Sequence, residues 1–433
     1  MDKTIGLACN ISTGKLDANQ AVSGGEYPFF TCAEFPDQID HFAYDDDVVL
    51  VAGNNARGNF HVSRYKGKFN AYQRTYILTA KEGFNIDYVY YALKLELKRL
   101  REKSQGSQTK FLTMPILTGI HFRDITGDEQ TEIANVLSVI DKKIELNNLI
   151  NAELEAMAKT LYDYWFVQFD FPDANGNPYK TSGGKIVYNP TLKREIPEGW
   201  KVKKLADVTS LIRRGISPKY TDEGGISVLN QKCVRNQKIS FEDARRHKIE
   251  LDDEDERLLK PFDVVVNSTG VGTLGRVAYV KRLPEKKTTV DSHVSIVRAK
   301  SELLSPLYLA WKLMRHQPVI ESAANGSTGQ VELSKSFLED IDVIIPSDSI
   351  VKRFEEFVTP LVPELASRES ENEQLVQLRD WLLPMLMNGQ VTVEWSTLRF
   401  GFYWRSMPLR CWWLSFWYKK ASRSTIFWVV QVI

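Results

Sequence analysis

Two long stretches of the chain place apolar residues alternately three and four positions apart. The first stretch carries Ile150, Leu154, Met157, Leu161 and Tyr164, preceded by Ile133, Val136, Ile140 and Ile144. The second carries Leu375, Leu378, Leu382 and Met385, preceded by Phe354, Phe357, Leu361 and Leu365. A narrow stripe with this spacing is typical of the seam of a coiled coil. The pattern therefore predicts two long helices, over 127–167 and 347–390.

The remaining faces of both predicted helices are polar and acidic. An antiparallel pair buries both stripes at once; the alternative is that each helix packs on its own globular domain. Asp128 and Asp348 stand just before the two patterns and are the expected N-caps. Pro360 and Pro363 remove backbone donors, so we expect an interruption in the first half of the second helix.

Shorter patterns recur along the chain in the same order. Segment 47–58 resembles segment 263–275, because each is an apolar β-branched run followed by two glycines five residues apart. Further on, the polar loop 105–109 corresponds to 325–330, and the offset between the copies drifts by only a few residues. An ordered series of matches indicates that the chain contains two copies of one unit.

Each copy is predicted to contain strands, a short aromatic helix and then a long helix. The expected strands are 47–52, 60–65 and 75–78 in the first copy and 263–267, 276–280 and 294–297 in the second. The expected short helices are 86–95 and 306–313. The predicted fold class is therefore α+β: two similar globular domains separated by two long antiparallel coiled-coil helices.

A turn-rich stretch, 171–184, separates the two copies and reads as a loop. In chain order, the predicted organisation is a globular domain over 1–126, the first long helix over 127–167, a central loop over 168–196, a second globular domain over 197–346, the second long helix over 347–390, and a tail over 391–433.

The composition, with 43% hydrophobic and 26% charged residues, excludes a mostly disordered chain. No apolar run approaches the ~20 residues that span a bilayer, and the chain starts without a signal peptide. The four cysteines are scattered and form no CxxC pair, which argues against disulfides and zinc. We therefore expect a cytoplasmic protein that neither spans nor binds a membrane.

The formal net charge of +1 does not by itself suggest a nucleic-acid partner. Segments 127–160 and 347–390 each carry four more acidic than basic residues, so any basic surface must lie on the globular domains. The tail from Trp395 onward has six basic residues, no acidic ones and six of the ten tryptophans. We assign this tail no function.

Motifs for catalysis are absent or incomplete. The run 270–275 fits GxGxxG, but a strand-like segment follows it where a dinucleotide site needs a helix. Arg276-Val277 also replaces the Lys-Ser/Thr of a P-loop, so we interpret the glycines as hairpin turns. Asn177-Pro178-Tyr179 only partly resembles the motif of amino-methyltransferases. The six histidines show no metal-ligand spacing, and we expect no catalytic residue and no metal site in this chain.

Hydrogen-bonding residues stand at equivalent turns of both copies. Arg suits guanine and Asn or Gln suits adenine, while Lys and Ser/Thr suit phosphates. The candidate DNA-binding residues are Asn54, Asn55, Arg57, Tyr72, Gln73, Arg74, Gln105, Gln108, Lys110, Arg213, Arg214, Lys219, Tyr220, Gln231, Lys232, Asn267, Thr269, Arg276, Thr328 and Gln330. Any one of them taken alone is better explained as part of a solvated loop. The recurrence of the whole set in both copies favours a binding surface.

Several longer motifs resemble one known family. They are Leu161-Tyr162-Asp163-Tyr164-Trp165-Phe166-Val167, Phe169-Asp170-Phe171-Pro172, Ile196-Pro197-Glu198-Gly199-Trp200 and Leu382-Leu383-Pro384-Met385-Leu386-Met387-Asn388-Gly389. Over about residues 1–390 the chain resembles the specificity subunit of type I restriction–modification enzymes.

The resemblance implies that each globular half is a target recognition domain that reads one part of a split double-stranded DNA site, and that the paired helices set the gap. It implies two methyltransferase subunits that bring S-adenosylmethionine and methylate adenine, and restriction subunits that use ATP and Mg²⁺. This chain itself would hold no cofactor. The residues expected on the subunit-contact helices are Ile140, Ile150, Leu154, Met157, Leu161, Leu375, Leu378 and Leu382.

Two other functions remain open from the sequence. The first alternative is one half of a self-contained methyltransferase or restriction enzyme. The second is an adaptor protein whose domains do not bind DNA. The absence of a complete catalytic motif weighs against the first, and the repeated polar turns weigh against the second.

Overall fold

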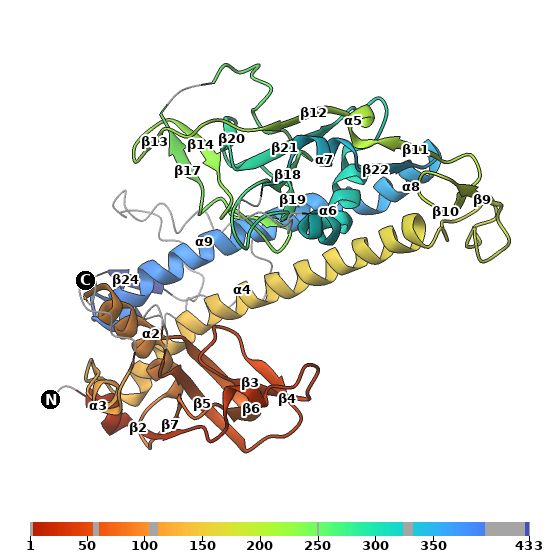
Figure 1. Cartoon of the computed structure of the whole chain (residues 1–433). Coiled ribbons are helices and arrows are strands. Elements are labelled where there is room, and N and C mark those ends of the chain that lie inside the picture. Colours follow the sequence, from red (N-terminus) through yellow and green to blue (C-terminus); the bar gives the residue numbers. More distant parts are fainter. Residues whose placement is uncertain are drawn as a thin grey trace, which may run out of the picture. The chain divides into compact units, whose positions relative to one another are not determined.

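The structure is a computed structural model that describes residues 3–54, 60–103, 111–248, 251–323, 332–394 and 429–432; for 100–103, 323, 394 and 429–432 only the backbone is described. It forms two compact units (Figure 1). The first unit combines Met1–Leu146 with Asn372–Ile433, and the second is Asn147–Glu371. Both unit boundaries fall inside the long helices.

The first unit is built on a six-stranded sheet in the order β2-β7-β5-β6-β3-β4. Its strands are β2 (Cys9–Thr13), β3 (Tyr27–Phe30), β4 (Asp37–Ile39), β5 (Tyr44–Ala52), β6 (Val62–Ala71) and β7 (Thr75–Ala80). All its neighbouring strands are antiparallel except β3 and β6. Shorter elements flank it: β1 (Lys3–Thr4), α1 (Ile5–Ala8), η1 (Ala18–Gln20), α2 (Ile86–Lys103), α3 (Met114–Thr118) and β8 (His121–Phe122).

The second unit repeats this plan with the four-stranded order β12-β21-β18-β19. The corresponding elements are β11 (Lys201–Lys204), α5 (Leu205–Val208), β12 (Thr209–Arg214), β18 (Val264–Asn267), β19 (Val277–Tyr279), β21 (Val294–Ala299), α6 (Pro306–Ala323), α7 (Lys335–Glu339) and β22 (Asp342–Ile345). A second sheet, β13-β17-β14-β20, consists of β13 (Tyr220–Thr221), β14 (Ile226–Leu229), β17 (Arg245–His247) and β20 (Thr288–Val290). β15 (Val234–Arg235) pairs with β16 (Lys238–Ile239).

The strand order confirms the predicted duplication. β2-β7-β5-β6 and β12-β21-β18-β19 share one order, and each unit adds an antiparallel pair, β1 with β8 or β11 with β22. The interpretation of Gly270 and Gly275 as hairpin turns is also confirmed, because they join the antiparallel neighbours β18 and β19 with positive φ angles of 103° and 81°. The two aromatic helices are longer than predicted and reach Lys103 and Ala323.

The long helices are α4 (Gly127–Tyr162), α8 (Asp348–Val358) and α9 (Leu361–Met387), and a π-helical turn (Asp163–Val167) follows α4. The predicted interruption is confirmed, since α8 ends and α9 begins around Pro360. The two predicted N-caps are wrong. Thr126 caps α4 in a reciprocal box with Glu129, and Ser347 occupies the N-cap of α8.

In each unit α4 and α9 lie side by side in opposite directions (Figure 1). Asp141 accepts a hydrogen bond from Arg379 at 2.8 Å in the first unit. In the second unit, Asn147 donates to Glu371 at 2.7 Å and Asn151 donates to the Leu365 carbonyl at 3.3 Å. As the residue number increases along α4, the number of the partner residue on α9 decreases. The antiparallel pairing and the predicted fold class are therefore confirmed.

The predicted seam of α4 is wrong in its second half. Met157 is 63% exposed and Tyr164 is 38% exposed, whereas Asn147, Asn151 and Ala158 are buried. A search for apolar residues leaves out asparagine. The stripe predicted from the sequence therefore lies beside the face of α4 that is buried in the structure. Phe357 and Leu378, also placed in the second stripe, are 60% and 39% exposed.

The central stretch contains more order than the predicted loop. β9 (Ile186–Asn189) and β10 (Arg194–Pro197) form an antiparallel hairpin. The Phe171 ring stacks between Tyr179 and Trp200, with centroid distances of 4.6 and 5.1 Å. In the tail, β23 (Val391–Glu394) pairs with β24 (Val429–Val432), and 395–428 lie outside the described residues. Within the described part of the chain, no helix is long and apolar enough to span a membrane.

Candidate nucleic-acid interface

The polar turns of the first unit meet at one place, which we call the first rim (residues 14–17, 53–54, 72–75 and 111–112). The Gly53 amide donates to the Arg74 carbonyl at 2.8 Å, and the Leu112 amide donates to the Gly53 carbonyl at 3.0 Å. The Gln73 amide donates to the Leu16 carbonyl at 2.8 Å. Backbone bonds therefore join turns that are distant in the sequence.

The second unit builds the same arrangement, the second rim (residues 214–216, 267–269, 291–293 and 332–333). The Ser268 amide donates to the His293 carbonyl at 2.8 Å, and the Leu333 amide donates to the Ser268 carbonyl at 2.9 Å. A bridge between Thr269 and Glu332 matches the bridge between Asn54 and Phe111 in the first rim. The two rims thus share one backbone framework but carry different side chains.

One glycine in each rim is required by close approach of two backbones. A Cβ at Gly14 would overlap the carbonyl group of Ala71, and a Cβ at Gly215 would overlap that of Val290. Each glycine directly follows the first strand of its sheet: Gly14 follows β2, and Gly215 follows β12. This tight crossing brings the chain after that strand against the neighbouring turn.

The rims present side chains that donate and accept hydrogen bonds. In the first, Gln73 and Arg74 are exposed, and Gln73 donates to Asp17 at 2.7 Å. In the second, Thr269 lies 2.6 Å from a ring nitrogen of His293, and Arg214 pairs with Glu332 and donates to the Leu333 carbonyl. Arg213, next to this rim, pairs with Glu256.

A polar cluster beside the second rim was only partly predicted. The Tyr220 hydroxyl donates to Asp291 at 3.0 Å, and the Arg245 guanidinium lies 4.6 Å from the centre of the Tyr220 ring. Burial and the charge of Asp291 raise the pKa of Tyr220 to about 12, so its hydroxyl remains a donor at neutral pH. Lys219, another predicted residue, is exposed at the start of this cluster. The sequence signal that was passed over is the basic run that contains Arg245 and Arg246.

The structure places one predicted DNA-binding residue, Asn267, inside the second domain and not at its surface. The Asn267 side chain is fully buried and donates to the carbonyls of Gln231 and Thr273, so it holds the framework together. Arg276 is half-buried and donates to the Gly272 carbonyl within the hairpin turn. Because the Asn267 side chain donates to the Gln231 carbonyl, Gln231 lies next to the second rim. The exposed Lys232 follows Gln231 in the chain.

Seven predicted residues lie outside the described part of the chain: Asn55, Arg57, Gln105, Gln108, Lys110, Thr328 and Gln330. The remaining first-unit candidates, Asn54 and Tyr72, belong to the first rim, where the Tyr72 amide donates to the Phe30 carbonyl at 2.9 Å.

The predicted subunit-contact residues divide by exposure. Ile140, Leu375 and Leu382 are buried in the core of the first unit. Ile150, Leu154 and Leu161 are half-buried. Met157 and Leu378 are the exposed members of the eight, at 63% and 39%.

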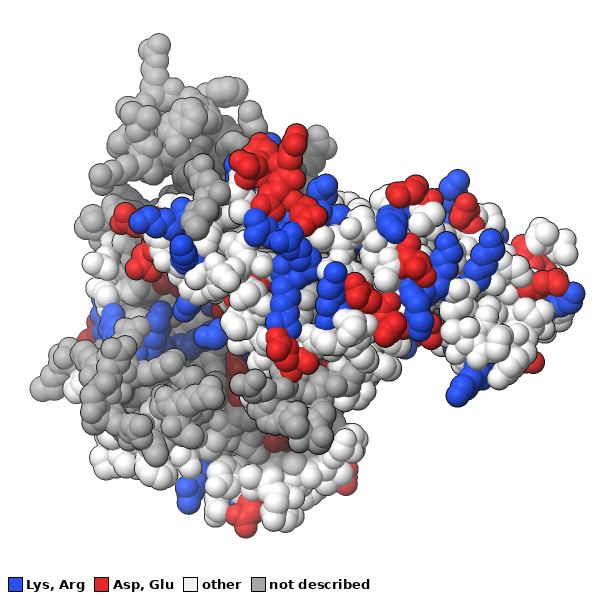
Figure 2. Space-filling model, turned by 45° about the horizontal axis from the view of Figure 1, so that its top comes forward, with Lys and Arg blue, Asp and Glu red and all other residues white. Residues whose placement is uncertain are grey.

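Charges of both signs are mixed on the face of the molecule drawn in Figure 2. Figure 2 shows Lys and Arg side chains interspersed with Asp and Glu rather than one continuous basic field. Ion pairs such as Arg246–Glu285 and Lys287–Asp253 account for part of this mixture. Among the described residues, no group of three or more His, Cys, Asp or Glu is placed to hold a metal ion.

Comparison with known proteins matches these two copies to one family. Residues 2–156 and 197–376 match the type I restriction modification DNA specificity domain. The chain is 40% identical over 225 residues to the type I restriction enzyme EcoDI specificity subunit of Escherichia coli, covering 48% of this chain and 49% of that protein. It is 28% identical over 327 residues to the MjaIX specificity subunit of Methanocaldococcus jannaschii, covering 72% and 71%.

A solved structure shares the fold. The crystal structure of the type-I restriction-modification system S subunit from M. genitalium aligns with a TM-score of 0.56 and 17% identity, over 89% of this chain and 96% of that one.

The matched segments contain both rims and cover more than half of the chain. The chain therefore belongs to the family of type I restriction–modification DNA specificity proteins, which recognise DNA sequence and are not themselves catalytic. The match to the EcoDI subunit spans about half of that relative, 49%. The resemblance read from the motifs is confirmed, and the two alternatives, a self-contained enzyme and an adaptor that does not bind DNA, are not supported.

Proposed function

We propose that this chain reads a double-stranded DNA site made of two short motifs separated by a fixed gap, with one globular domain on each motif. The observation that carries the proposal is the repetition of the rim. The backbone hydrogen bond from Gly53 to Arg74 in the first unit has its equivalent in the bond from Ser268 to His293 in the second. The shared framework supplies a common way to meet DNA, and the different side chains supply two different motifs.

The long helices are proposed to set the gap between the two motifs. α4 begins in the first unit and ends in the second, while α9 begins in the second and ends in the first. A helix has a fixed rise of about 1.5 Å per residue. Two continuous helices bonded to each other in both units make a spacer whose length is set by residue number.

We propose that two methyltransferase subunits bind the helices and supply S-adenosylmethionine for adenine methylation. Exposed apolar side chains support this: Leu149 and Met157 on the α4 part of the second unit, and Leu378 and Trp381 on the α9 part of the first. Methylation requires the target base to leave the stack, so the domains must hold distorted DNA. Restriction subunits that use ATP and Mg²⁺ complete the proposed complex, which we place in the cytoplasm. No cofactor is assigned to this chain.

Footprinting of the purified complex of this chain with methyltransferase subunits tests the proposal. We expect two short protected segments with a constant gap, and an affinity that falls as salt rises because phosphate contacts release counterions. One continuous footprint, or equal affinity for unrelated sequences, would contradict a bipartite reader.

An alanine substitution in the first rim tests its residues. Arg74→Ala is expected to weaken binding by about 1–3 kcal/mol, roughly 5- to 150-fold, and to relax selectivity at one position of one half-motif. Arg74 is exposed, and its backbone carbonyl, which alanine keeps, makes the rim bond to Gly53. Lys66→Ala is the control, because Lys66 is 78% exposed in the same domain but outside the rim. If both variants weakened DNA binding equally, the result would contradict the placement of the DNA interface at the rim.

A further inference from the structure

In each unit, a polar side chain from the globular domain contacts the pair of long helices α4 and α9. In the first unit, the Tyr91 hydroxyl on α2 donates to Asp141 on α4 at 2.8 Å. The second oxygen of Asp141 accepts from Arg379 on α9 at 2.8 Å. We call this group of three residues the first clasp.

The second unit has a corresponding group, the second clasp. Lys281, just after β19, donates to Glu155 on α4 at 2.7 Å and to Glu369 on α9 at 2.8 Å. Lys238 also faces Glu155, at 3.6 Å. In both clasps a residue of the domain and one residue from each long helix meet, although the residue types differ.

In both clasps the residue that comes from the domain is shielded from water. The Lys281 side chain is 5% exposed, and Tyr91 is buried. Burial alone would lower the pKa of Lys281, but the charges of Glu369 and Glu155 raise that pKa above its ordinary value, so the ammonium stays charged. Burial and the charge of Asp141 raise the pKa of Tyr91, so its hydroxyl stays protonated and can donate. Shielded charge-assisted bonds of this kind have strict geometry.

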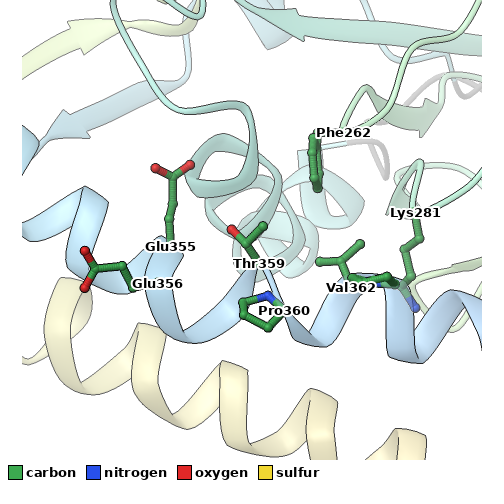
Figure 3. Close-up of a pocket in the computed structure, with 8 residues that line it drawn as sticks. Phe262, Lys281, Glu355, Glu356, Thr359, Pro360 and Val362 are labelled. Carbon is green, nitrogen blue, oxygen red and sulfur yellow. The ribbon is translucent and has the colours of Figure 1, made fainter.

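Lys281 of the second clasp lies near the junction between α8 and α9. Lys281 lines a shallow cleft of about 470 Å³ together with Phe262, Thr359, Pro360 and Val362. Figure 3 shows the Lys281 side chain pointing toward α9 near Val362. Because α8 ends at Val358 and α9 begins at Leu361, apolar packing of α8 does not by itself fix where α9 lies. The bond from Lys281 to Glu369 ties α9 directly to the domain.

Polar contacts near the second clasp also join the two long helices. Asn147 binds Glu371, and Asn151 binds the Leu365 carbonyl. An apolar seam tolerates sliding, whereas a buried polar residue at a seam position specifies one register because other registers leave it unpaired. The face on which each helix meets its partner and its domain is therefore defined by directional bonds.

We propose that the two clasps fix the axial and rotational position of each recognition domain on its helix segments, and that they thereby determine how strictly the gap between the two DNA motifs is read. This inference rests on the proposed bipartite function. One base pair advances a duplex by about 3.4 Å and rotates it by about 35°. A domain free to slide or turn by such amounts on its helices would accept neighbouring gaps.

The test uses the complex with methyltransferase subunits and DNA in which both half-motifs are kept while the gap is varied by one or two base pairs. The variants remove each clasp as a whole, so that no buried charge is left unpaired: Lys281→Met with Glu155→Gln and Glu369→Gln for the second clasp, and Tyr91→Phe with Asp141→Asn and Arg379→Met for the first. Lys238 and Asp380, which also pair with clasp residues, are 38% and 51% exposed and lie in contact with water. Lys286→Met is the matched control, since Lys286 is 87% exposed in a surface ion pair with Asp253.

Each clasp variant is expected to lose at least about tenfold of the preference for the native gap over gaps one base pair longer or shorter, while selectivity for each half-motif stays within about twofold. The control should keep both preferences. Unchanged gap preference in both variants, or loss of half-motif selectivity together with gap preference, would overturn the inference. If the unmodified complex shows no fixed gap, the proposed function itself fails, which is a different result.

Discussion

Phe354→Ala is expected to destabilise the protein by about 3–5 kcal/mol, the usual cost of removing a buried phenylalanine ring. Phe354 on α8 is fully buried. Its ring meets Phe166 edge-on at 5.2 Å and Tyr162 at 5.9 Å, and lies 6.3 Å from Trp165. These three aromatic residues come from the end of α4 and the turn after it, so the substitution opens a cavity where both long helical segments meet the second domain.

Phe357→Ala is the matched control for this prediction. Phe357 lies on the same helix but is 60% exposed, with an edge-on contact to Trp165 at 6.1 Å. Its loss should cost less than about 1 kcal/mol, as for most surface substitutions. Urea unfolding of the two variants measures the difference. Equal losses would mean that α8 does not pack as described.

Lengthening both long helices is expected to widen the preferred DNA gap without changing either half-motif. Four residues inserted between Asp141 and Asn147 in α4, and four between Glu371 and Arg379 in α9, add about 6 Å and leave about 40° of extra rotation. That corresponds to one or two base pairs at about 3.4 Å each. Both helices must be changed, because the bonds Asp141–Arg379 and Asn147–Glu371 link them on either side of the insertion.

The gap is measured by selecting bound sequences from DNA with a randomised spacer. Four residues inserted into the exposed turn at 174–177 of the central stretch serve as the control and should leave the gap unchanged. A gap that stays the same in the lengthened protein would show that the helices are not the spacer. A changed half-motif would show that the insertion acts on the recognition domains instead.

The duplication and the fold class were accessible from the sequence because they depend on patterns that a strand or helix must carry. The β-branched runs that became β5 and β18 align with their following glycines, and the two prolines near residue 360 mark the break between α8 and α9. The hairpin interpretation of Gly270 and Gly275 succeeded for the same reason, since positive φ angles favour glycine.

The contact face of α4 was not accessible from the sequence. Asn147 and Asn151 lie on the buried face and make specific polar contacts. A search for apolar spacing passes over such residues and selects exposed ones like Met157 instead. The clasp residue Lys281 was missed for a similar reason, because a lysine after a strand ordinarily points to solvent.

The candidate site was predicted in outline but not residue by residue. The polar turns do converge, as Gly53 with Arg74 and Ser268 with His293 show. Whether an asparagine faces solvent or the framework depends on tertiary packing, and Asn267 is buried where its neighbour Thr269 is not. The short strands between β12 and β18 lie in turn-rich sequence and gave no periodic signal.

Mapping of methylated adenine in the genome of cells that carry this chain with its methyltransferase subunits tests the central claim most directly. The account predicts adenine methylation at one two-part motif with a constant gap, lost when the gene for this chain is removed and moved to another gap when both helices are lengthened. Methylation at a single uninterrupted motif, or a pattern that persists without this chain, would contradict it.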